Sequence, residues 1–271
     1  MKRLLYIVIP MLITLAVISL SLVSRGVDKK GVLDISQQTE QNTKPEKVST
    51  YDHVSIQAAI DKWIAGNSGD YAVIVRDVSS NQVLGQYNSD EEFFSASIYK
   101  LYIAMLGYID IDNGALDDAD LLVGTQSLGE CLDLMVRESD SPCGEALLAR
   151  YDRSDAQDRL EQLGILGIDI NGFTITASGV DALLSVISDR GISDLEESMR
   201  RQVYDKGLRA AFSSYEVLDK VGFSPDDWHD VGFIDGLQGG RVSIVVLSRD
   251  AGSSGVRSLG EALRKSLEFT R

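Results

Sequence analysis

The segment FFSASIYKLYIAM, residues 93–105, places Ser97 and Lys100 three residues apart in a largely apolar and aromatic run. Its apolar side chains recur at helical spacing, which predicts a helix with a broad apolar face: Ile98, Leu101, Tyr102, Met105 and Leu106. A buried lysine costs several kcal/mol unless it is paired or deprotonated. Lys100 is therefore either less buried than the pattern indicates, or it has a chemical role.

Ser97 and Lys100 share one face of the predicted helix, because side chains at i and i+3 are neighbours. A desolvated lysine has a lowered pKa and becomes a base that can activate a serine hydroxyl. The free backbone N–H groups of a first helical turn can stabilise an oxyanion. The pattern suggests nucleophilic catalysis; the alternative is a capping serine followed by a lysine that reaches solvent.

Two further motifs carry polar side chains at the ends of predicted elements. The first, SDS at residues 139–141, falls between two predicted helices, so that a short loop presents the Ser139 hydroxyl. The second, KVG at residues 220–222, ends a predicted strand, where Gly222 lets a ligand lie against the backbone. The alternatives are a plain helix cap for the first motif and a solvent-facing lysine for the second.

Hydrophobic periodicity predicts the order helix, two strands, a central block of helices, three strands and a terminal helix. The strands are expected at residues 71–78, 82–88, 216–223, 228–236 and 241–250. Within the central block, residues 196–212 are expected to form one helix. Strands that flank a helical insertion can pair into one sheet. The predicted fold class is α+β, an antiparallel sheet flanked by helices with a central all-helical subdomain.

The three motifs, in this order and in these contexts, resemble those of the penicillin-recognising serine hydrolases, specifically the class A beta-lactamase-like family. That family carries Ser-x-x-Lys at a helix start, Ser-Asp-Asn on a loop and Lys-Thr-Gly on a strand. The resemblance spans most of residues 51–271 and includes DKGLRAAF at residues 205–212. It implies a beta-lactamase/transpeptidase-like fold.

The resemblance also implies a role for each motif residue. Ser97 would be the acylated nucleophile, and Lys100 would be the general base or proton relay. Ser139 would pass a proton to the leaving nitrogen, and Lys220 would hold the electrostatics of the site and help to bind a substrate carboxylate. The backbone N–H groups of Ser97 and Phe223 would form the oxyanion hole.

The departures from the family pattern concern substrate binding and release of the acyl group. Ser141 replaces an asparagine that binds the acyl side chain, and Val221 replaces a hydroxyl-bearing residue that recognises the substrate carboxylate. The family's Glu-x-x-Leu-Asn loop, whose glutamate activates the deacylating water, has no counterpart, since Glu161 has the wrong local pattern. We expect Ser141, Gly222 and Phe223 to contact the substrate, acylation to survive and deacylation to be slow.

The N-terminal region predicts a membrane signal anchor over residues 1–25. Residues 4–23 carry no charge and would span ~30 Å as a helix, and the two preceding cations place the N-terminus in the cytoplasm. A cleaved signal peptide, which leaves a secreted protein, is the alternative. Residues 26–50 predict a flexible linker, and residues 51–271 a folded domain outside the cytoplasm.

Charge and cysteine usage narrow the set of partners. The formal net charge of −15 argues against a nucleic-acid partner. Cys131 and Cys143 are expected to form a disulfide outside the membrane, and two free thiols are the alternative. Together with His53 and His229, these cysteines match no zinc spacing, so we expect no metal and no other cofactor.

The primary functional prediction is an extracytoplasmic serine hydrolase that forms an acyl-enzyme and deacylates slowly. Its expected partners are a beta-lactam or the D-Ala-D-Ala-type stem peptide of peptidoglycan, and the membrane through residues 4–23. D,D-peptidase activity is included, because the fold alone does not choose the substrate. The alternative is a non-catalytic module that binds cell-wall peptide or a protein on the same fold, although retention of all four polar site residues argues against it.

Other enzyme classes lack their motifs. Gly-x-Ser-x-Gly is absent, and GTQSLGE at residues 124–130 lacks the lysine of a phosphate-binding loop. His229 and Asp230 stand next to each other on a predicted strand, so that their side chains point to opposite faces and cannot act as a dyad.

Overall fold

The computed structural model describes residues 47–268. The predicted signal anchor and most of the predicted linker lie outside these residues. Within residues 47–268, every helix is too short or too polar to span a bilayer.

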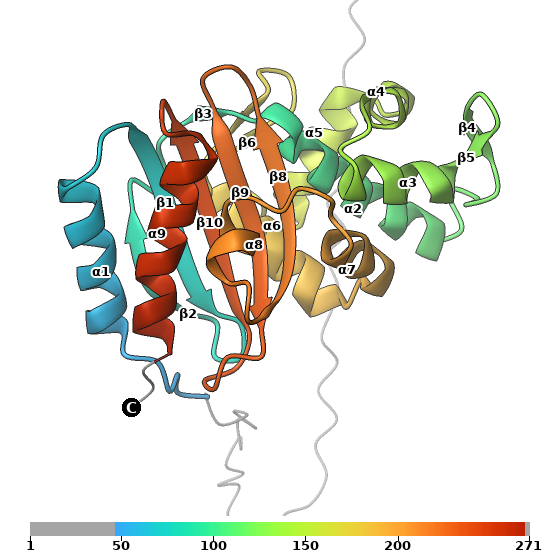
Figure 1. Cartoon of the computed structure of the whole chain (residues 1–271). Helices are drawn as coiled ribbons and strands as arrows, with labels where there is room; N and C mark the ends of the chain where they lie inside the picture. The colour runs from blue at the N-terminus through green and yellow to red at the C-terminus, as the bar shows by residue number, and fades with distance from the viewer. Residues whose placement is uncertain (1–46, 269–271) are drawn as a thin grey trace, which may run out of the picture. The chain divides into compact units, whose positions relative to one another are not determined.

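A five-stranded antiparallel sheet combines strands from both ends of the described chain (Figure 1). Its strand order is β2-β1-β10-β9-β8, and the strands are β1 (Asp70–Asp77), β2 (Gln82–Tyr87), β8 (Glu216–Phe223), β9 (Trp228–Asp235) and β10 (Val242–Arg249). β1 pairs with β10 along its whole length. The predicted single sheet around a helical insertion is therefore confirmed, and β8 is left as an edge strand.

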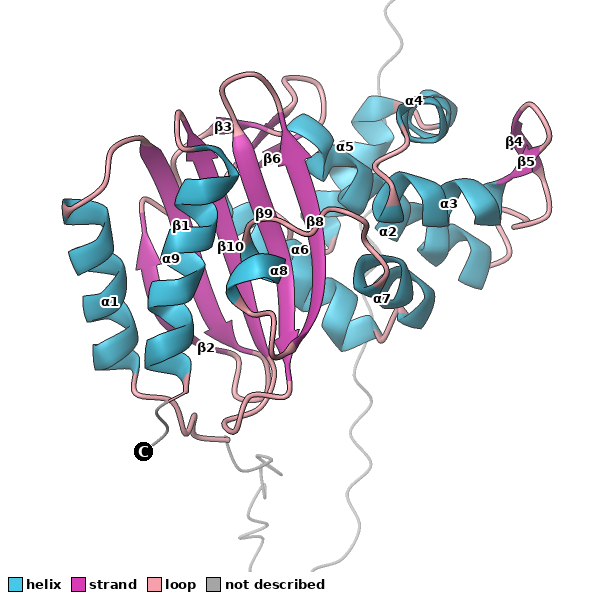
Figure 2. Cartoon of the chain, in the orientation of Figure 1, coloured by secondary structure: helices cyan, strands magenta, loops and turns pink. Residues whose placement is uncertain are grey.

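The two faces of the sheet bury different cores, as the alternation of side chains along a strand requires. In β1, Tyr71, Val73 and Val75 pack in the core shared with the helices α1 (His53–Ala65), α8 (Leu208–Ala211) and α9 (Gly252–Leu267). Ala72 and Ile74 pack in the core on the opposite face, which includes the helical block. Figure 2 shows α1 and α9 in front of the sheet and α6 behind it.

The helical block surrounds one buried helix, α2. Its helices are α2 (Tyr99–Asp112), α3 (Leu128–Arg137), α4 (Ser141–Arg150), α5 (Arg153–Gln162), α6 (Ala177–Arg190) and α7 (Ser193–Arg200), and β4 (Leu121–Val123) with β5 (Gln126–Ser127) forms a small hairpin beside them. Every residue of α2 from Lys100 to Gly107 is buried. Such a helix is expected to be apolar all round, and Lys100 is the exception.

Residues 196–212, predicted as one helix, form two helices instead. α7 ends at Arg200, and α8 begins at Leu208 after an irregular segment. Gly207, with φ 64° and ψ −129°, has a conformation that favours glycine. A Cβ at this position would lie 2.2 Å from the Asp230 carboxylate, which accepts a hydrogen bond from the Leu208 N–H at 2.7 Å. The prediction was wrong because this buried tertiary contact outweighs helical propensity.

A second, three-stranded sheet joins a short strand before α2 to a hairpin inside the helical block. It has the order β3-β7-β6, formed by β3 (Phe93–Phe94), β6 (Ile168–Asp169) and β7 (Thr174–Ile175). The β6–β7 hairpin carries the chain from α5 to α6. The Ser95 N–H donates to the Phe173 carbonyl oxygen of this hairpin at 2.7 Å. The hairpin therefore fixes the segment that enters α2.

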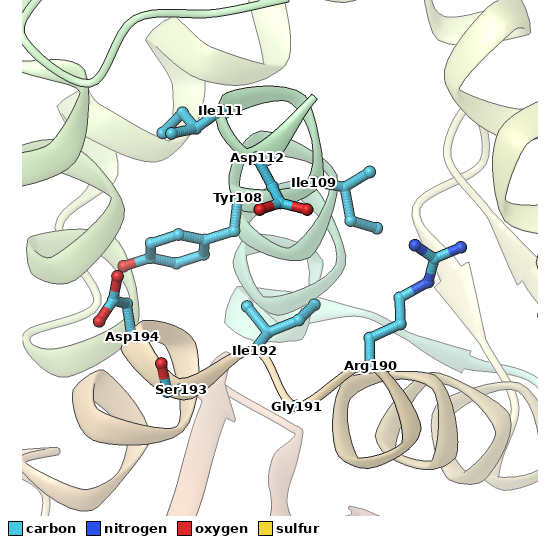
Figure 3. Close-up of a pocket in the computed structure, with 9 residues that line it drawn as sticks. All are labelled: Tyr108, Ile109, Ile111, Asp112, Arg190, Gly191, Ile192, Ser193 and Asp194. Carbon is cyan, nitrogen blue, oxygen red and sulfur yellow. The ribbon is translucent and has the colours of Figure 1, made fainter. Parts of the chain in front are cut away.

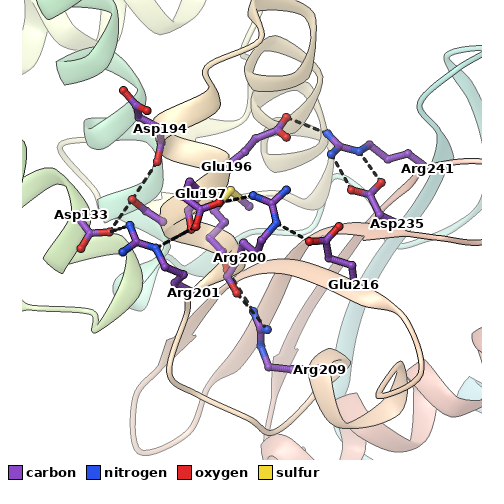
Figure 4. Close-up of polar contacts among 12 residues, drawn as sticks. Asp133, Asp194, Glu196, Glu197, Arg200, Arg201, Arg209, Glu216, Asp235 and Arg241 are labelled. Carbon is purple, nitrogen blue, oxygen red and sulfur yellow. Dashed lines mark hydrogen bonds and ion pairs between the residues drawn. The ribbon is translucent and has the colours of Figure 1, made fainter.

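Ion pairs around α7 connect the helical block to the large sheet (Figure 4). Arg201, directly after α7, pairs with Asp133 of α3 at 2.9 Å. Arg241 pairs with Glu196 of α7 at 2.9 Å and with Asp235 of β9 at 2.7 Å. Single exposed ion pairs contribute at most about 1 kcal/mol. Arg241, which pairs with both α7 and β9, nevertheless fixes the direction of α7 relative to the large sheet.

Candidate active site

Ser97 lies in a 3₁₀ turn, η1 (Ala96–Ile98), that leads directly into α2. Ala96 has a φ of 42°, which is costly for a residue other than glycine. Ala96 and Ile98 are buried, and Ser97 between them is partly exposed. The backbone therefore anchors its apolar side chains in the core and leaves the Ser97 hydroxyl accessible.

Lys100 is buried, with 1% of its surface exposed. Its ammonium group donates hydrogen bonds to the Ser97 hydroxyl at 3.3 Å, to the Ser139 carbonyl oxygen at 2.6 Å and to the Ser141 hydroxyl at 3.1 Å. Three acceptors match the three protons of a lysine ammonium group. The predicted pairing of Lys100 with Ser97 is present in the structure.

Burial lowers the pKa of Lys100, and the carboxylates of Asp140 and Glu145 oppose this shift. A lysine with a lowered pKa is more often neutral, and only the neutral amine can accept a proton. Its nitrogen lies 3.3 Å from the Ser97 hydroxyl oxygen. Lys100 is thus placed to accept the Ser97 proton.

Ser139 connects Lys100 to the third motif. It lies in the loop between α3 and α4, with a φ of 61°. Its carbonyl oxygen accepts from Lys100, and its hydroxyl accepts from the Lys220 ammonium group at 2.8 Å. Two residues far apart in sequence therefore hold one loop serine.

The disulfide between Cys131 and Cys143 restrains this loop. The two cysteines lie 12 positions apart, on α3 and α4, so that the bridge spans the Ser139 loop. Asp140 caps α4 by accepting from the Cys143 N–H at 2.8 Å. A loop of this length is stabilised by roughly 3 kcal/mol in the chain-entropy model. The predicted bridge is confirmed.

Lys220, on the edge strand β8, is fully buried. Besides Ser139, its ammonium group donates to the carbonyl oxygen of Val221 at 2.6 Å. Burial and the nearby charge of Lys100 lower the pKa of Lys220 to about 7, while Asp219 and Asp230 oppose the shift. The charge of Lys220 therefore changes near neutral pH.

Two carboxyl groups on neighbouring strands were not predicted from the sequence. Asp219 and Asp230 are both fully buried on β8 and β9. Burial raises the pKa of Asp219 to about 6 although Arg209 pairs with it, and burial with the neighbouring Asp219 raises the pKa of Asp230. The position of Asp219 next to Lys220 is the only signal the sequence offers.

His229 faces away from Asp230, as the alternation along a strand predicted. Its Nε2 lies 2.7 Å from the Phe94 carbonyl oxygen, and its Nδ1 accepts from the Ser248 N–H at 3.1 Å. Both ring nitrogens are therefore engaged with the backbone, and the exclusion of a His229–Asp230 dyad is confirmed.

Gly222 brings the end of β8 against the turn that carries Ser97. A Cβ at Gly222 would lie 2.9 Å from Ile98 Cγ1 and 3.1 Å from the Ser97 backbone nitrogen. Ser224 donates its N–H to Asp227, and hydrogen-bonded pairs alternate along an antiparallel ladder. The Phe223 N–H therefore points away from β9, out of the sheet edge. The Phe223 side chain is 43% exposed.

The structure shows the surroundings of the three positions at which the sequence departs from the family pattern. The Ser141 hydroxyl is engaged by Lys100, while the residue itself is exposed. Val221 is fully buried and offers no hydroxyl. Glu161 lies on α5, is exposed and accepts a hydrogen bond from Gln157 at 3.1 Å. Its charge is not among those that act on Lys100.

A cavity of about 310 Å³ lies at the other end of α2 (Figure 3). Tyr108 and Asp112 of α2 line it together with Arg190 and with Asp194 of α7. It contains none of the predicted site residues. Among residues 47–268, no cluster of histidine, cysteine and acidic side chains is arranged to hold a metal ion.

The family model described as the beta-lactamase enzyme family matches residues 55–266. The chain belongs to this family. No curated protein sequence matches it. The family confirms the class to which the three motifs pointed.

Solved structures share the fold at low sequence identity. A beta-lactamase from Xanthomonas campestris pv. campestris matches with a TM-score of 0.72 and 16% identity, over 80% of this chain and 99% of that chain. A variant of PBP-A, solved as an acyl-enzyme complex with penicillin G, matches with a TM-score of 0.74 and 17% identity, over 82% and 99%. An ancestral class A beta-lactamase matches with a TM-score of 0.70 and 15% identity, over 78% and 99%. These likenesses confirm the predicted fold class.

Replacement of Gly222 by alanine is expected to slow the reaction of Ser97 with a fluorescent penicillin by about tenfold or more, and to lower the free energy of unfolding by about 1–3 kcal/mol. The added methyl group would meet the backbone of Ser97 and Ile98, which cannot move without shifting α2. Labelling rates and urea denaturation measure the two effects.

Gly66→Ala is the matched control, because a Cβ there meets only backbone oxygens at 3.7 Å. It is expected to leave the labelling rate unchanged. A Gly222→Ala variant that labels at the wild-type rate would show that the close approach of β8 to Ser97 does not matter for the reaction.

Proposed function

We propose that this chain is an extracytoplasmic serine enzyme that forms an acyl-enzyme at Ser97 with beta-lactams or D-Ala-D-Ala-type cell-wall peptides and releases the acyl group slowly. One observation carries the proposal. Ser139 accepts hydrogen bonds from both buried lysines, and Lys100 also contacts the Ser97 hydroxyl. A purely structural role does not require two buried ammonium groups around two serines.

The arrangement of these residues supports the following route to acylation. Neutral Lys100 accepts the proton of Ser97 as the Ser97 oxygen attacks the substrate carbonyl carbon. The developing oxyanion is stabilised by the backbone N–H groups of Ser97 and Phe223. The C–N bond of the substrate then breaks, and the Ser139 hydroxyl donates a proton to the leaving nitrogen. The proton that Lys100 took from Ser97 then returns to the Ser139 oxygen, so that acylation leaves Lys100 neutral and Ser139 protonated, with Ser97 acylated.

Lys220 contributes charge to the same step. When protonated, it orients the Ser139 hydroxyl and attracts a substrate carboxylate, a charge-assisted interaction stronger than a neutral one. Its distance of 2.8 Å to the Ser139 oxygen supports the first role. Because Val221 brings no hydroxyl, carboxylate recognition depends more heavily on this single ammonium group.

The substrate class rests on the family and on the fold. A mutant of PBP-A, a solved structure with this fold, was captured as an acyl-enzyme complex with penicillin G. The same chemistry on this chain would open a beta-lactam or cleave a D-Ala-D-Ala peptide. Slow release is proposed because Glu161 is engaged by Gln157 on α5 and does not act on Lys100.

The location proposed is the outer side of the membrane, with residues 4–23 as a single-pass anchor. The uncharged N-terminal segment and its flanking cations motivate it. The disulfide supports it, because such bridges persist in oxidising compartments.

The second candidate is a binding module without catalysis. Val221 and the short side chain of Ser141 favour it, because both weaken contacts that the family uses for substrate. A module of this kind would bind cell-wall peptide reversibly and leave Ser97 unmodified.

Incubation with a fluorescent penicillin is expected to give a covalent adduct on the wild-type protein and none on Ser97→Ala. Intact-mass measurement over time follows formation and loss of the adduct, and Ser89→Ala, a serine outside the site, is the control. An adduct that persists for many turnover times of an efficient beta-lactamase supports slow release.

Two other outcomes contradict parts of the proposal. Transient labelling with rapid accumulation of hydrolysed drug would show efficient deacylation. No adduct and no hydrolysis would reject acylation by penicillins and favour the binding module.

The preference for a substrate carboxylate is expected to fall as pH rises through about 7, the pKa of Lys220. Below this pH Lys220 is charged and attracts the carboxylate; above it the neutral amine does not. The measurement is the ratio of acylation rates for a penicillin and its methyl ester, in which the titration of Lys100 cancels. The ratio should fall by about tenfold; a ratio that is constant with pH would contradict the role of Lys220.

A further inference from the structure

The site lacks the family's water-activating glutamate. Other carboxylates nevertheless lie near Lys100. Two acidic residues act electrostatically on Lys100, namely Asp140 and Glu145. Asp140 is occupied as the cap of α4, where it accepts the Cys143 N–H at 2.8 Å. The carboxylate of Glu145 makes no hydrogen bond or ion pair with any residue between 47 and 268, and the residue is exposed.

Helix geometry places Glu145 on the face of α4 that carries Ser141. Ser141 and Glu145 are four residues apart on α4 and therefore share one face. The Ser141 hydroxyl lies 3.1 Å from Lys100 Nζ, which places this face beside the catalytic lysine. Side chains on a helix lean toward its N-terminus. The Glu145 side chain accordingly leans back toward Ser141 and the site.

Gly144 allows α4 to pack closely against Tyr99 and Lys100. A Cβ at Gly144 would lie 2.9 Å from the Tyr99 hydroxyl and 3.0 Å from the Cγ and Cε atoms of Lys100. The backbone next to Glu145 thus lies directly against the residues that follow Ser97 in sequence. The charge of Glu145 also raises the pKa of Tyr99, in addition to the larger effect of burial.

We propose that Glu145 is the general base that activates the water for release of the acyl group from Ser97. This inference rests on the proposed function, since it requires an acyl-enzyme. It also accounts for the pattern of the sequence: the chain has no Glu-x-x-Leu-Asn motif but carries a carboxylate one helical turn beyond Ser141.

Release of the acyl group is the hydrolysis of the ester between the acyl group and Ser97. The water oxygen attacks the acyl carbonyl carbon, and Glu145 takes a proton from that water. The bond between the acyl carbon and the Ser97 oxygen breaks, and Ser97 regains a proton from Lys100. Glu145 gives the proton that it took from the water to Lys100, so that Lys100 ends neutral, as it began. The products are a free carboxylic acid and the free Ser97 hydroxyl.

The test separates acylation from release. Wild-type protein, Glu145→Gln and the matched control Glu161→Gln are labelled with a fluorescent penicillin, excess drug is removed, and the loss of adduct is followed by intact mass. Glu145→Gln is expected to acylate at least as fast as wild type, because loss of this charge lowers the pKa of Lys100 further. Its adduct is expected to last about 100-fold longer, the usual lower range for loss of a general base. Glu161→Gln should behave as wild type.

Hydroxylamine provides a readout that a merely structural role would not give. It attacks an acyl ester without a general base, so it should release the Glu145→Gln adduct as fast as the wild-type adduct. An adduct that resists hydroxylamine would mean that the variant closes the site, and would overturn the assignment.

The remaining outcomes distinguish the two proposals. If wild-type protein and Glu145→Gln both form adducts and lose them at the same rate, Glu145 is not the base, while the proposed function stands. If wild-type protein forms no adduct, the proposed function fails and this inference fails with it.

Discussion

The hydrogen bonds that Ser139 receives from Lys100 and Lys220 are the interaction on which the rest of the site depends. Two buried ammonium groups would be strongly destabilising without acceptors. The fold supplies these acceptors by three independent means: the turn into α2, the loop restrained by the disulfide, and the edge strand β8. Because each lysine comes from a different part of the chain, the site exists only when the helical block and the sheet are both in place.

Electrostatics makes the site sensitive to pH around neutrality. The pKa of Lys220 is lowered from 10.5 to about 7, by burial first and then by the charge of Lys100. Between these two values the unfolded chain binds a proton that the folded protein does not, so stability from this group increases as pH rises through the window. Below about 7 the folded protein buries the charge, and the Asp219 carboxylate opposes this cost only until it is itself protonated, at a pKa of about 6. Function and stability therefore favour opposite charge states of Lys220.

The sequence predicted the parts of the structure that depend on local pattern. The periodicity of the strands led to the correct sheet. The spacing of Ser97 and Lys100 at the start of a buried helix led to the correct contact between these two residues. The break at Gly207 was missed because it depends on the buried Asp230 carboxylate, a contact that no local pattern encodes. Glu145 was missed for a similar reason, since its relation to Lys100 depends on the close packing of α4 at Gly144.

Titration of the lysine side chains by NMR tests the central claim most directly. In protein with isotope-labelled lysine, the signal that is lost in Lys220→Arg is assigned to Lys220 and followed with pH. The account predicts that this signal titrates near 7, far below the ordinary lysine value of 10.5. A Lys220 signal that titrates near 10.5 would show that the two lysines are neither buried together nor coupled through Ser139, and would contradict the account.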